Sequence, residues 1–137
     1  MENGKKKRRI LIYTVDYDLA KSLTLLLEDQ YRVQSTSSLA RGVDAIEHRE
    51  IDLLICDLGL SLDEGVAAFE QLSTKNSDIP IIVFCPYQIR YSAMEGKIRK
   101  RVNYCYHKPV NIEEVTQTIA HLLRSQKKTP HLIHTHH

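Results

Sequence analysis

Hydrophobic residues in this chain follow two kinds of pattern, which alternate along the sequence. Short apolar runs alternate with longer segments in which apolar residues recur with the period of an α-helix. The runs Leu53–Cys56 and Pro80–Cys85 are apolar throughout, which is typical of strands that are covered on both faces of a sheet. The predicted strands are Ile10–Thr14, Arg32–Ser35, Leu53–Cys56, Pro80–Cys85 and Asn103–Tyr106.

The segments between these runs predict helices. After the first strand, apolar residues recur on one helical face. They are Leu19, Leu23, Leu26 and Leu27. Asp18, Ser38 (or its neighbour Ser37) and Asn111 can cap the starts of the first, second and last helices. The other predicted helices are Leu39–His48, Gly65–Leu72, a weakly patterned one within Pro86–Arg101, and Ile112–Arg124.

This alternation predicts an α/β fold, in which five parallel strands form a sheet with helices on both faces. Binding sites in such sheets lie at the carboxyl ends of the strands. Asp57, Cys85 and Lys108 lie at or just beyond the ends of three predicted strands. We therefore expect these residues, which are far apart in the sequence, to meet at one edge of the sheet.

Composition and charge restrict the possible functions only slightly. A chain of 137 residues with 42% hydrophobic residues is typical of one globular domain, and a net charge of +2 does not identify a partner. The apolar runs are too short to cross a membrane, and no signal-peptide pattern follows the basic start. We expect a cytoplasmic protein without membrane insertion, with a basic arm over residues 1–8, a domain over 9–124 and a disordered tail over 125–137.

Several motifs at compatible spacing resemble those of the receiver domain of two-component response regulators. Asp57–Ser61 is similar to the family's D-[LM]-x-[LM]-P motif, with Ser61 in place of the usual proline. Gly65 falls where the family has a glycine at the start of its third helix. Ile79–Phe84 is similar to the fourth strand, and Lys108–Pro109 to the K-P motif. The resemblance extends over nearly the whole chain and implies a flavodoxin-like sheet with the strand order 2-1-3-4-5.

The resemblance also implies a chemistry and a class of partner. Asp57 would be the phosphoacceptor, whose carboxylate attacks the phosphorus of a phosphohistidine or a small phosphodonor. Lys108 would pair with the phosphoryl oxygens, and Mg²⁺ would neutralise the remaining charge. The implied partners are proteins of a phosphorelay: a histidine kinase, a phosphotransfer protein or a downstream effector. Without the surrounding motifs, a structural ion pair between Asp57 and Lys108 would be the simpler interpretation.

The predicted metal site departs from the family pattern. Receivers end the first strand with two adjacent acids that hold the metal, often followed by a third. If Asp16 were the first acid, the buried positions of the next helix would fall on polar residues such as Lys21. With Thr14 at the first position they fall mostly on leucines, so Thr14–Val15 replaces the acidic pair and Asp16 is third. Asp57 and Asp16 are the candidate ligands that remain, and we predict weak or absent Mg²⁺ binding.

The conformational switch of the family is altered as well. Receivers have Ser or Thr at the end of the fourth strand and an aromatic residue three positions before the lysine. This chain has Cys85 and Cys105 there. The Cys85 thiol is a weaker hydrogen-bond donor than a hydroxyl, and Cys105 has no aromatic ring that could move. We therefore expect the two-state switch to be missing. Together with Cys56 they are expected to be reduced core thiols, and a redox pair of Cys85 and Cys105 is the alternative.

We therefore expect an atypical, pseudo-receiver-like signalling protein that binds another protein and is not an enzyme. The resemblance places the binding surface on the fourth helix, fifth strand and fifth helix, where positive charge favours an acidic partner. The candidate residues are Arg90, Lys97, Arg99, Lys100, Tyr104 and Tyr106. His107 is expected to be a surface residue.

Two other functions are compatible with the sequence. The first is an ordinary Asp57 phosphoacceptor with rearranged metal binding. The second is a nucleic-acid-binding module that uses the basic residues 5–9 and the basic fourth helix over 97–101. The sequence contains no helix-turn-helix or other DNA-binding motif, which counts against nucleic acid as a partner.

Overall fold

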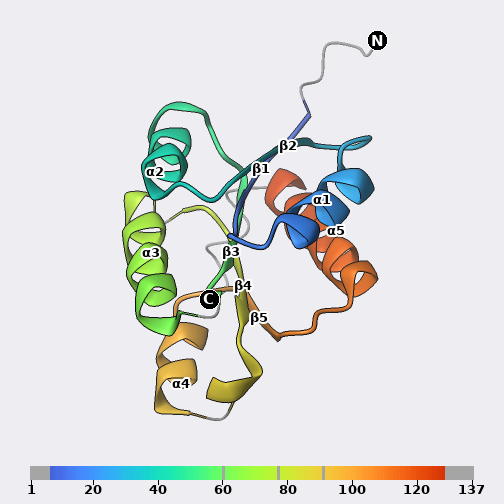
Figure 1. Cartoon of the computed structure of the whole chain (residues 1–137). Helices are drawn as coiled ribbons and strands as arrows, with labels where there is room; N and C mark the ends of the chain where they lie inside the picture. Colours follow the sequence, from blue (N-terminus) through green and yellow to red (C-terminus); the bar gives the residue numbers. More distant parts are fainter. Residues whose placement is uncertain (1–6, 60, 77, 91, 129–137) are drawn as a thin grey trace.

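The strands form a single parallel sheet, which confirms the predicted fold class and strand order. The computed structural model describes residues 7–59, 61–76, 78–90 and 92–128, and in it the sheet runs β2-β1-β3-β4-β5 with every neighbouring pair parallel (Figure 1). The strands are β1 (Arg9–Tyr13), β2 (Arg32–Thr36), β3 (Leu53–Asp57), β4 (Ile81–Cys85) and β5 (Tyr104–His107). Each lies within one residue of its predicted range at either end.

Helices cover both faces of this sheet (Figure 1). On one face lie α1 (Tyr17–Leu27) and α5 (Ile112–Lys128); on the other lie α2 (Leu39–His48), α3 (Leu62–Lys75) and α4 (Ala93–Arg99), with the 3₁₀ turn η1 (Tyr87–Ile89) before α4. β3 and β4 are buried along their whole length, and their alternate side chains enter the two cores. This burial on both faces explains why both strands are apolar. No helix among the described residues is long and apolar enough to cross a bilayer.

The start of α1 and its buried face differ from the prediction. The carboxylate of Asp16, not that of Asp18, caps the helix: Asp16 Oδ1 accepts a hydrogen bond from the Leu19 N–H at 3.1 Å. Asp18 lies in the first turn, where its charge suits the helix dipole. The prediction that Leu26 faces the core is also wrong. Leu26 is 54% exposed, because the buried face follows an i, i+4 line that passes through Leu27.

The last two helices also have different limits from those predicted. α4 is confined to Ala93–Arg99, a short part of the weakly patterned segment. α5 continues to Lys128, beyond the predicted end at Arg124, so the first residues of the predicted tail are helical. The rest of that tail, 129–137, and most of the basic arm, 1–6, lie outside the described residues.

Gly65 lets α3 pack closely against the segment that follows β3. A Cβ atom at Gly65 would lie 1.8 Å from the Leu58 carbonyl oxygen. We expect Gly65→Ala to lower the free energy of unfolding by about 3 kcal/mol in urea denaturation, because backbone must move to make room. Gly96→Ala is the control, since no described atom lies within 4 Å of a Cβ there and alanine has the better helix propensity. A loss at Gly65 no larger than the change at Gly96 would contradict this account.

Candidate functional site

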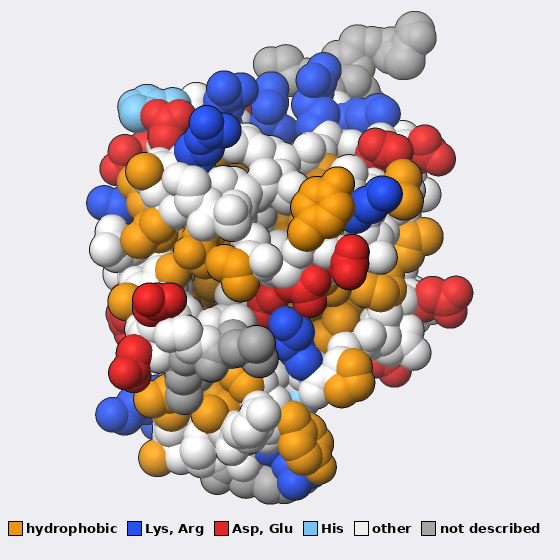
Figure 2. Space-filling view, viewed as in Figure 1, with side chains coloured by type: hydrophobic (Ala, Val, Ile, Leu, Met, Phe, Trp, Pro, Cys, Tyr) orange, Lys and Arg blue, Asp and Glu red, His pale blue; other side chains and the backbone are white. Residues whose placement is uncertain are grey.

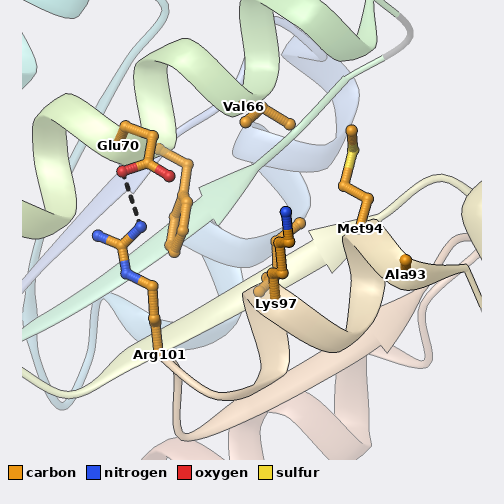
Figure 3. A pocket seen from close by; sticks show the side chains of 8 residues that line it. Val66, Glu70, Ala93, Met94, Lys97 and Arg101 are labelled. Atoms are coloured by element: carbon orange, nitrogen blue, oxygen red, sulfur yellow. Dashed lines mark ion pairs between the residues drawn. The ribbon is translucent and has the colours of Figure 1, made fainter.

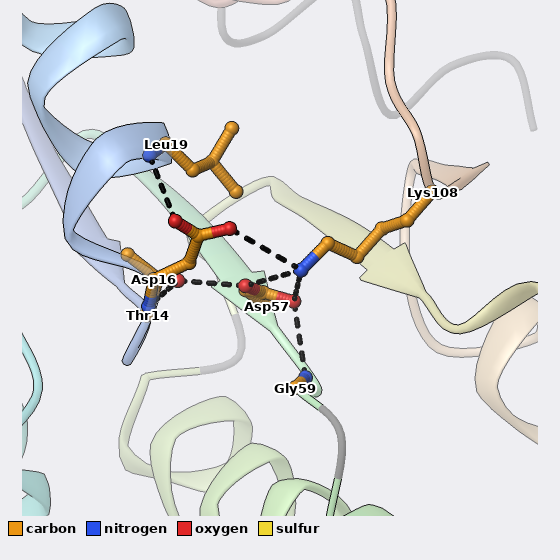
Figure 4. A network of polar contacts seen from close by, with 6 residues as sticks. All are labelled: Thr14, Asp16, Leu19, Asp57, Gly59 and Lys108. Carbon is orange, nitrogen blue, oxygen red and sulfur yellow. Dashed lines mark hydrogen bonds and ion pairs between the residues drawn. The ribbon is translucent and has the colours of Figure 1, made fainter.

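Asp57 is the last residue of β3, and its carboxylate is almost wholly buried at the carboxyl edge of the sheet. Asp57 Oδ1 accepts a hydrogen bond from the Gly59 N–H at 3.0 Å, and Oδ2 accepts one from the Thr14 hydroxyl at 2.6 Å. Lys108 Nζ lies 3.3 Å from Oδ1 and 3.1 Å from Oδ2 (Figure 4). One cation and two neutral donors therefore satisfy the buried carboxylate, which compensates for its removal from water.

Lys108 reaches this carboxylate from the end of β5. Its backbone N–H donates to the Cys85 carbonyl oxygen at 2.9 Å, which fixes the chain immediately after the strand. From there the side chain extends along the edge of the sheet toward β3 (Figure 4). The sheet thus joins Asp57 and Lys108 across a sequence separation of 51 residues.

The segment that follows β1 supplies a hydroxyl group to Asp57. The Thr14 oxygen that donates to Asp57 also accepts a hydrogen bond from the Asp16 N–H at 3.0 Å. Asp16 uses one carboxylate oxygen to cap α1 and places the other 3.9 Å from Lys108 Nζ (Figure 4). Val15 is 68% exposed and borders a small hollow beside Asp57, of about 60 Å³. Neither of the two positions directly after β1 offers a carboxylate.

Cys85 and Cys105 meet on the neighbouring strands β4 and β5. Their Sγ atoms are 3.0 Å apart; Cys85 is buried and Cys105 is half-buried. The hydrogen bond with Cys105, together with burial, raises the pKa of the Cys85 thiol. The same hydrogen bond lowers the pKa of Cys105, and the Arg99 guanidinium acts in the same direction. Burial and the charge of Asp57 raise the pKa of Cys56 to about 12, which disfavours the reactive thiolate of that residue near neutral pH.

A comparison with protein families identifies the group to which these features belong. The model of the response regulator receiver domain matches residues 10–120. The chain belongs to the response regulator receiver family. The receiver is 22% identical to the transcriptional regulatory protein ZraR of Klebsiella oxytoca over 93 residues, which are 68% of this chain and 21% of that protein. It is 22% identical to ZraR of Escherichia coli K12 over 104 residues, 73% of this chain and 23% of that protein. The receiver thus spans about a fifth of the length of these relatives.

Solved structures of other receivers share the fold. The CheY-like receiver domain protein of Methanospirillum hungatei JF-1 has a TM-score of 0.73 at 24% identity, over 90% of this chain and 98% of that chain. A two-component response regulator from Clostridium difficile has a TM-score of 0.75 at 19% identity, over 89% of this chain and 100% of that chain. At such identities the likeness establishes the fold alone, so the chemistry of the site is argued from its geometry.

A buried carboxylate, which the sequence did not reveal, joins α4 to β5 in this receiver. The Glu95 side chain is 5% exposed, and its Oε2 accepts a hydrogen bond from Arg99 Nε at 2.7 Å. His107 Nε2 lies 2.9 Å from the same oxygen, and the His107 side chain is 23% exposed. His107, which was predicted to be a surface residue, is therefore only partly exposed and also contacts a buried carboxylate. The i, i+4 spacing of Glu95 and Arg99 was the only sign in the sequence, and it does not reveal the contact with β5.

The remaining residues of the predicted partner surface differ in their availability. Lys97 and Lys100 are exposed on α4. Arg90 lies over the ring of a neighbouring tyrosine in η1, 3.8 Å from its centroid. The rings of Tyr104 and Tyr106 stack with centroids 6.3 Å apart, and the Tyr106 hydroxyl forms a hydrogen bond with Thr118 of α5. Tyr106 thus belongs to the packing of α5 on β5, whereas Tyr104 is 40% exposed.

Next to this surface, α3 and α4 enclose a groove of about 410 Å³ (Figure 3). An ion pair of 2.7 Å between Arg101 of the α4–β5 segment and Glu70 of α3 lies at one end of the groove (Figure 3). Most of the lining is apolar, with Lys97 as its other basic residue. The lining residues are Val66, Phe69, Glu70, Ala93, Met94, Lys97, Ile98 and Arg101.

Proposed function

We propose that this receiver is an atypical member of its family, without enzymatic activity, that binds a protein partner whether or not Asp57 is phosphorylated. The observation that carries the proposal is the hydrogen bond of 2.6 Å from the Thr14 hydroxyl to Asp57 Oδ2. A neutral donor lies where the family resemblance implies a metal-binding acid. The Asp57 carboxylate is already satisfied by Thr14, Gly59 and Lys108.

The groups around Asp57 are a poor fit for Mg²⁺. This ion requires oxygen ligands in near-octahedral geometry and is bound through carboxylates and water. Val15 has no ligand atom, and Thr14 directs its hydroxyl hydrogen at Asp57. Asp16 caps α1 and faces Lys108. In the part of the chain that the structure describes, no group of three or more His, Cys, Asp or Glu residues is suited to a metal ion. Weak or absent Mg²⁺ binding is therefore part of the proposal.

Weak metal binding would also make Asp57 a poor phosphoacceptor. A transferred phosphoryl group carries charge that metal ions and basic side chains normally neutralise together. Lys108 would be the nearby cation, and it already pairs with Asp57 and faces Asp16. The Asp57–Lys108 contact then serves as a structural ion pair rather than as catalytic apparatus.

The second candidate function is that of an ordinary phosphoacceptor with rearranged metal binding. Two observations favour it: Lys108 Nζ lies 3.1 Å from Asp57 Oδ2, and a hollow of about 60 Å³ adjoins the carboxylate. If the Asp16 side chain rotated away from the start of α1, it would bring a second carboxylate toward the hollow beside Asp57. Such a rearrangement requires the Leu19 N–H to lose its acceptor at the start of α1.

A phosphodonor experiment separates the two candidates. We expect incubation with acetyl phosphate and Mg²⁺ to leave the mass of the intact protein unchanged. The backbone amide NMR spectrum of α4 and β5 should also stay unchanged, because Asp57 gains no charge. Asp57→Ala serves as the control. A phosphoryl adduct that Asp57→Ala abolishes, accompanied by shifts in α4 and β5, would favour the ordinary phosphoacceptor instead.

The distribution of charge supports a protein partner with an acidic surface. Lys97 and Lys100 are exposed on α4 next to the apolar groove, so attraction and apolar burial are available together. Arg99 and Arg101 each pair with a carboxylate, which weakens the case for nucleic acid at residues 97–101. Figure 2 shows other basic side chains gathered where the chain starts. Just before β1, Arg8 Nη1 lies 4.0 Å from a carboxylate oxygen of Asp52.

A further inference from the structure

Two thiols face each other at the carboxyl ends of β4 and β5. Cys85 Sγ and Cys105 Sγ are 3.0 Å apart, and neither cysteine is in a disulfide. In the sheet, Cys105 lies opposite Val83 and Cys85 lies opposite His107, so the two cysteines are diagonal neighbours with side chains on the same face. The sulfur atoms of a disulfide are about 2.05 Å apart, so these sulfurs need to approach by about 1 Å to bond.

We propose that Cys85 and Cys105 are a reversible dithiol–disulfide pair, which a peroxide oxidises and a dithiol reduces, and that oxidation changes the surface formed by α4 and β5. The contact itself carries this proposal, because it places two thiols together on adjacent strands. It does not depend on whether Asp57 is phosphorylated.

The surroundings assign different roles to the two thiols. Cys105 is half-buried, and the neighbouring Arg99 side chain is 50% exposed, so a small peroxide can approach it from solvent. Arg99 also favours the thiolate, which is the form that attacks. Cys85 is buried and in contact with Cys105, so it is placed to attack an oxidised Cys105.

The chemistry takes place in two steps. The Cys105 thiolate attacks one oxygen of hydrogen peroxide; the O–O bond breaks, and the released hydroxide takes a proton to give water. This leaves a sulfenic acid on Cys105. The Cys85 sulfur then attacks the Cys105 sulfur, the S–O bond breaks, and a second water molecule leaves with the Cys85 proton. The thiols lose two electrons and two protons in total, and one peroxide becomes two water molecules. A dithiol such as dithiothreitol reverses the change by thiol–disulfide exchange.

Oxidation would act on α4 through the residues that hold it. Arg99 lies close enough to Cys105 to favour its thiolate, and it also donates to Glu95, which contacts His107 of β5. A disulfide would replace the Cys105 thiol beside Arg99 and draw the two sulfur atoms about 1 Å closer together next to these contacts. The conformation at α4 and β5 would then depend on the redox state of the two cysteines.

The direct test uses the fully reduced chain of 137 residues, treated with hydrogen peroxide and then digested for mass spectrometry. We expect a linked peptide that contains Cys85 and Cys105, lighter by two hydrogen atoms, which dithiothreitol separates. Cys56 should remain a free thiol, and in the untreated protein Cys105 should react with iodoacetamide at least about tenfold faster than Cys56. A disulfide that includes Cys56, or a sulfinic acid on Cys105 without the linked peptide, would overturn the proposal. So would a chain whose thiols all survive peroxide.

Matched variants distinguish this pair from other thiol chemistry. Cys105→Ser should leave Cys85 reduced after peroxide, whereas Cys56→Ala should keep the Cys85–Cys105 link. Asp57→Ala should form the same disulfide. The redox proposal can therefore be contradicted without contradicting the proposed function, and the reverse also holds. In the wild-type chain, oxidation should shift the amide signals of β4, β5 and α4 while those of α1 and α2 stay in place. If the amide signals of α4 do not change on oxidation, the proposed effect on the surface is wrong. The peptide map of the wild-type chain tests the disulfide itself, even if a variant does not fold.

Discussion

Replacement of Lys108 by methionine is expected to lower the free energy of unfolding by about 3 kcal/mol. The Asp57 side chain is 1% exposed, and Lys108 is its cationic partner in the described structure. Methionine keeps much of the length of the side chain but leaves the carboxylate buried with only the neutral donors Thr14 and Gly59. The Lys108 side chain is itself 26% exposed, so water can replace part of the lost interaction. Urea denaturation of the two proteins near neutral pH measures the difference.

Two further variants show whether the lost charge pair is the cause. Lys97→Met removes a cation from the exposed part of α4 and should change stability by less than about 0.5 kcal/mol. Combining Lys108→Met with Asp57→Asn removes both charges and should restore stability to within about 1 kcal/mol of wild type. If Lys108→Met alone behaves like Lys97→Met, Asp57 and Lys108 do not form a structural pair.

A structural role would explain why Asp57 and Lys108 are present although the two positions after β1, Thr14 and Val15, carry no carboxylate. The carboxylate ties the end of β3 to β1 through Thr14 and to the segment after β5 through Lys108. These contacts hold together the edge of the sheet from which α1 and α5 begin. Asp57 would then be needed for stability even in a receiver that is not phosphorylated.

The fold follows from the sequence because the strongest patterns come from burial. β3 and β4 are covered on both faces, and such strands must be apolar along their whole length. The helix starts are less determined, because Asp16 and Asp18 are both good caps and lie two residues apart. Asp16 is placed to accept from the Leu19 N–H because its own N–H donates to the Thr14 hydroxyl, which in turn donates to Asp57. That contact is tertiary, so local propensity does not determine it.

The sequence predicts which residues meet at the candidate site, but not which hydrogen bonds and ion pairs their side chains form. The ends of parallel strands share one edge, which brings Asp57, Lys108 and Cys85 to the same side of the sheet. Whether the Thr14 hydroxyl turns toward Asp57 depends on a rotamer that the sequence does not specify. The contact between Glu95 and His107 depends on how α4 docks, and α4 has only a weak pattern. The proposed function of this receiver therefore depends most on the contacts that the sequence predicts least.

Mg²⁺ binding is expected to appear when Thr14 and Val15 are both replaced by aspartate. The substitutions would place two carboxylates after β1 beside Asp57, which is the kind of oxygen-rich site that Mg²⁺ prefers. We expect calorimetry to show binding at least about a hundredfold tighter than in wild type, which corresponds to about 2.8 kcal/mol. Without Mg²⁺ the clustered carboxylates repel one another, so the variant should also be less stable than wild type and should regain stability as Mg²⁺ is added.

The matched control replaces the same residues by asparagine, which has the shape of aspartate without its charge. Thr14→Asn with Val15→Asn should bind Mg²⁺ as weakly as wild type, and its stability should not depend on Mg²⁺. Equal gains in both double variants would mean that loss of the Thr14–Asp57 hydrogen bond, and not the added carboxylates, opens the site. Micromolar Mg²⁺ binding by the wild-type chain would show that Asp16 leaves its cap to act as a ligand. The ordinary phosphoacceptor would then replace the proposed function, because the groups around Asp57 would be able to hold the metal that phosphoryl transfer uses.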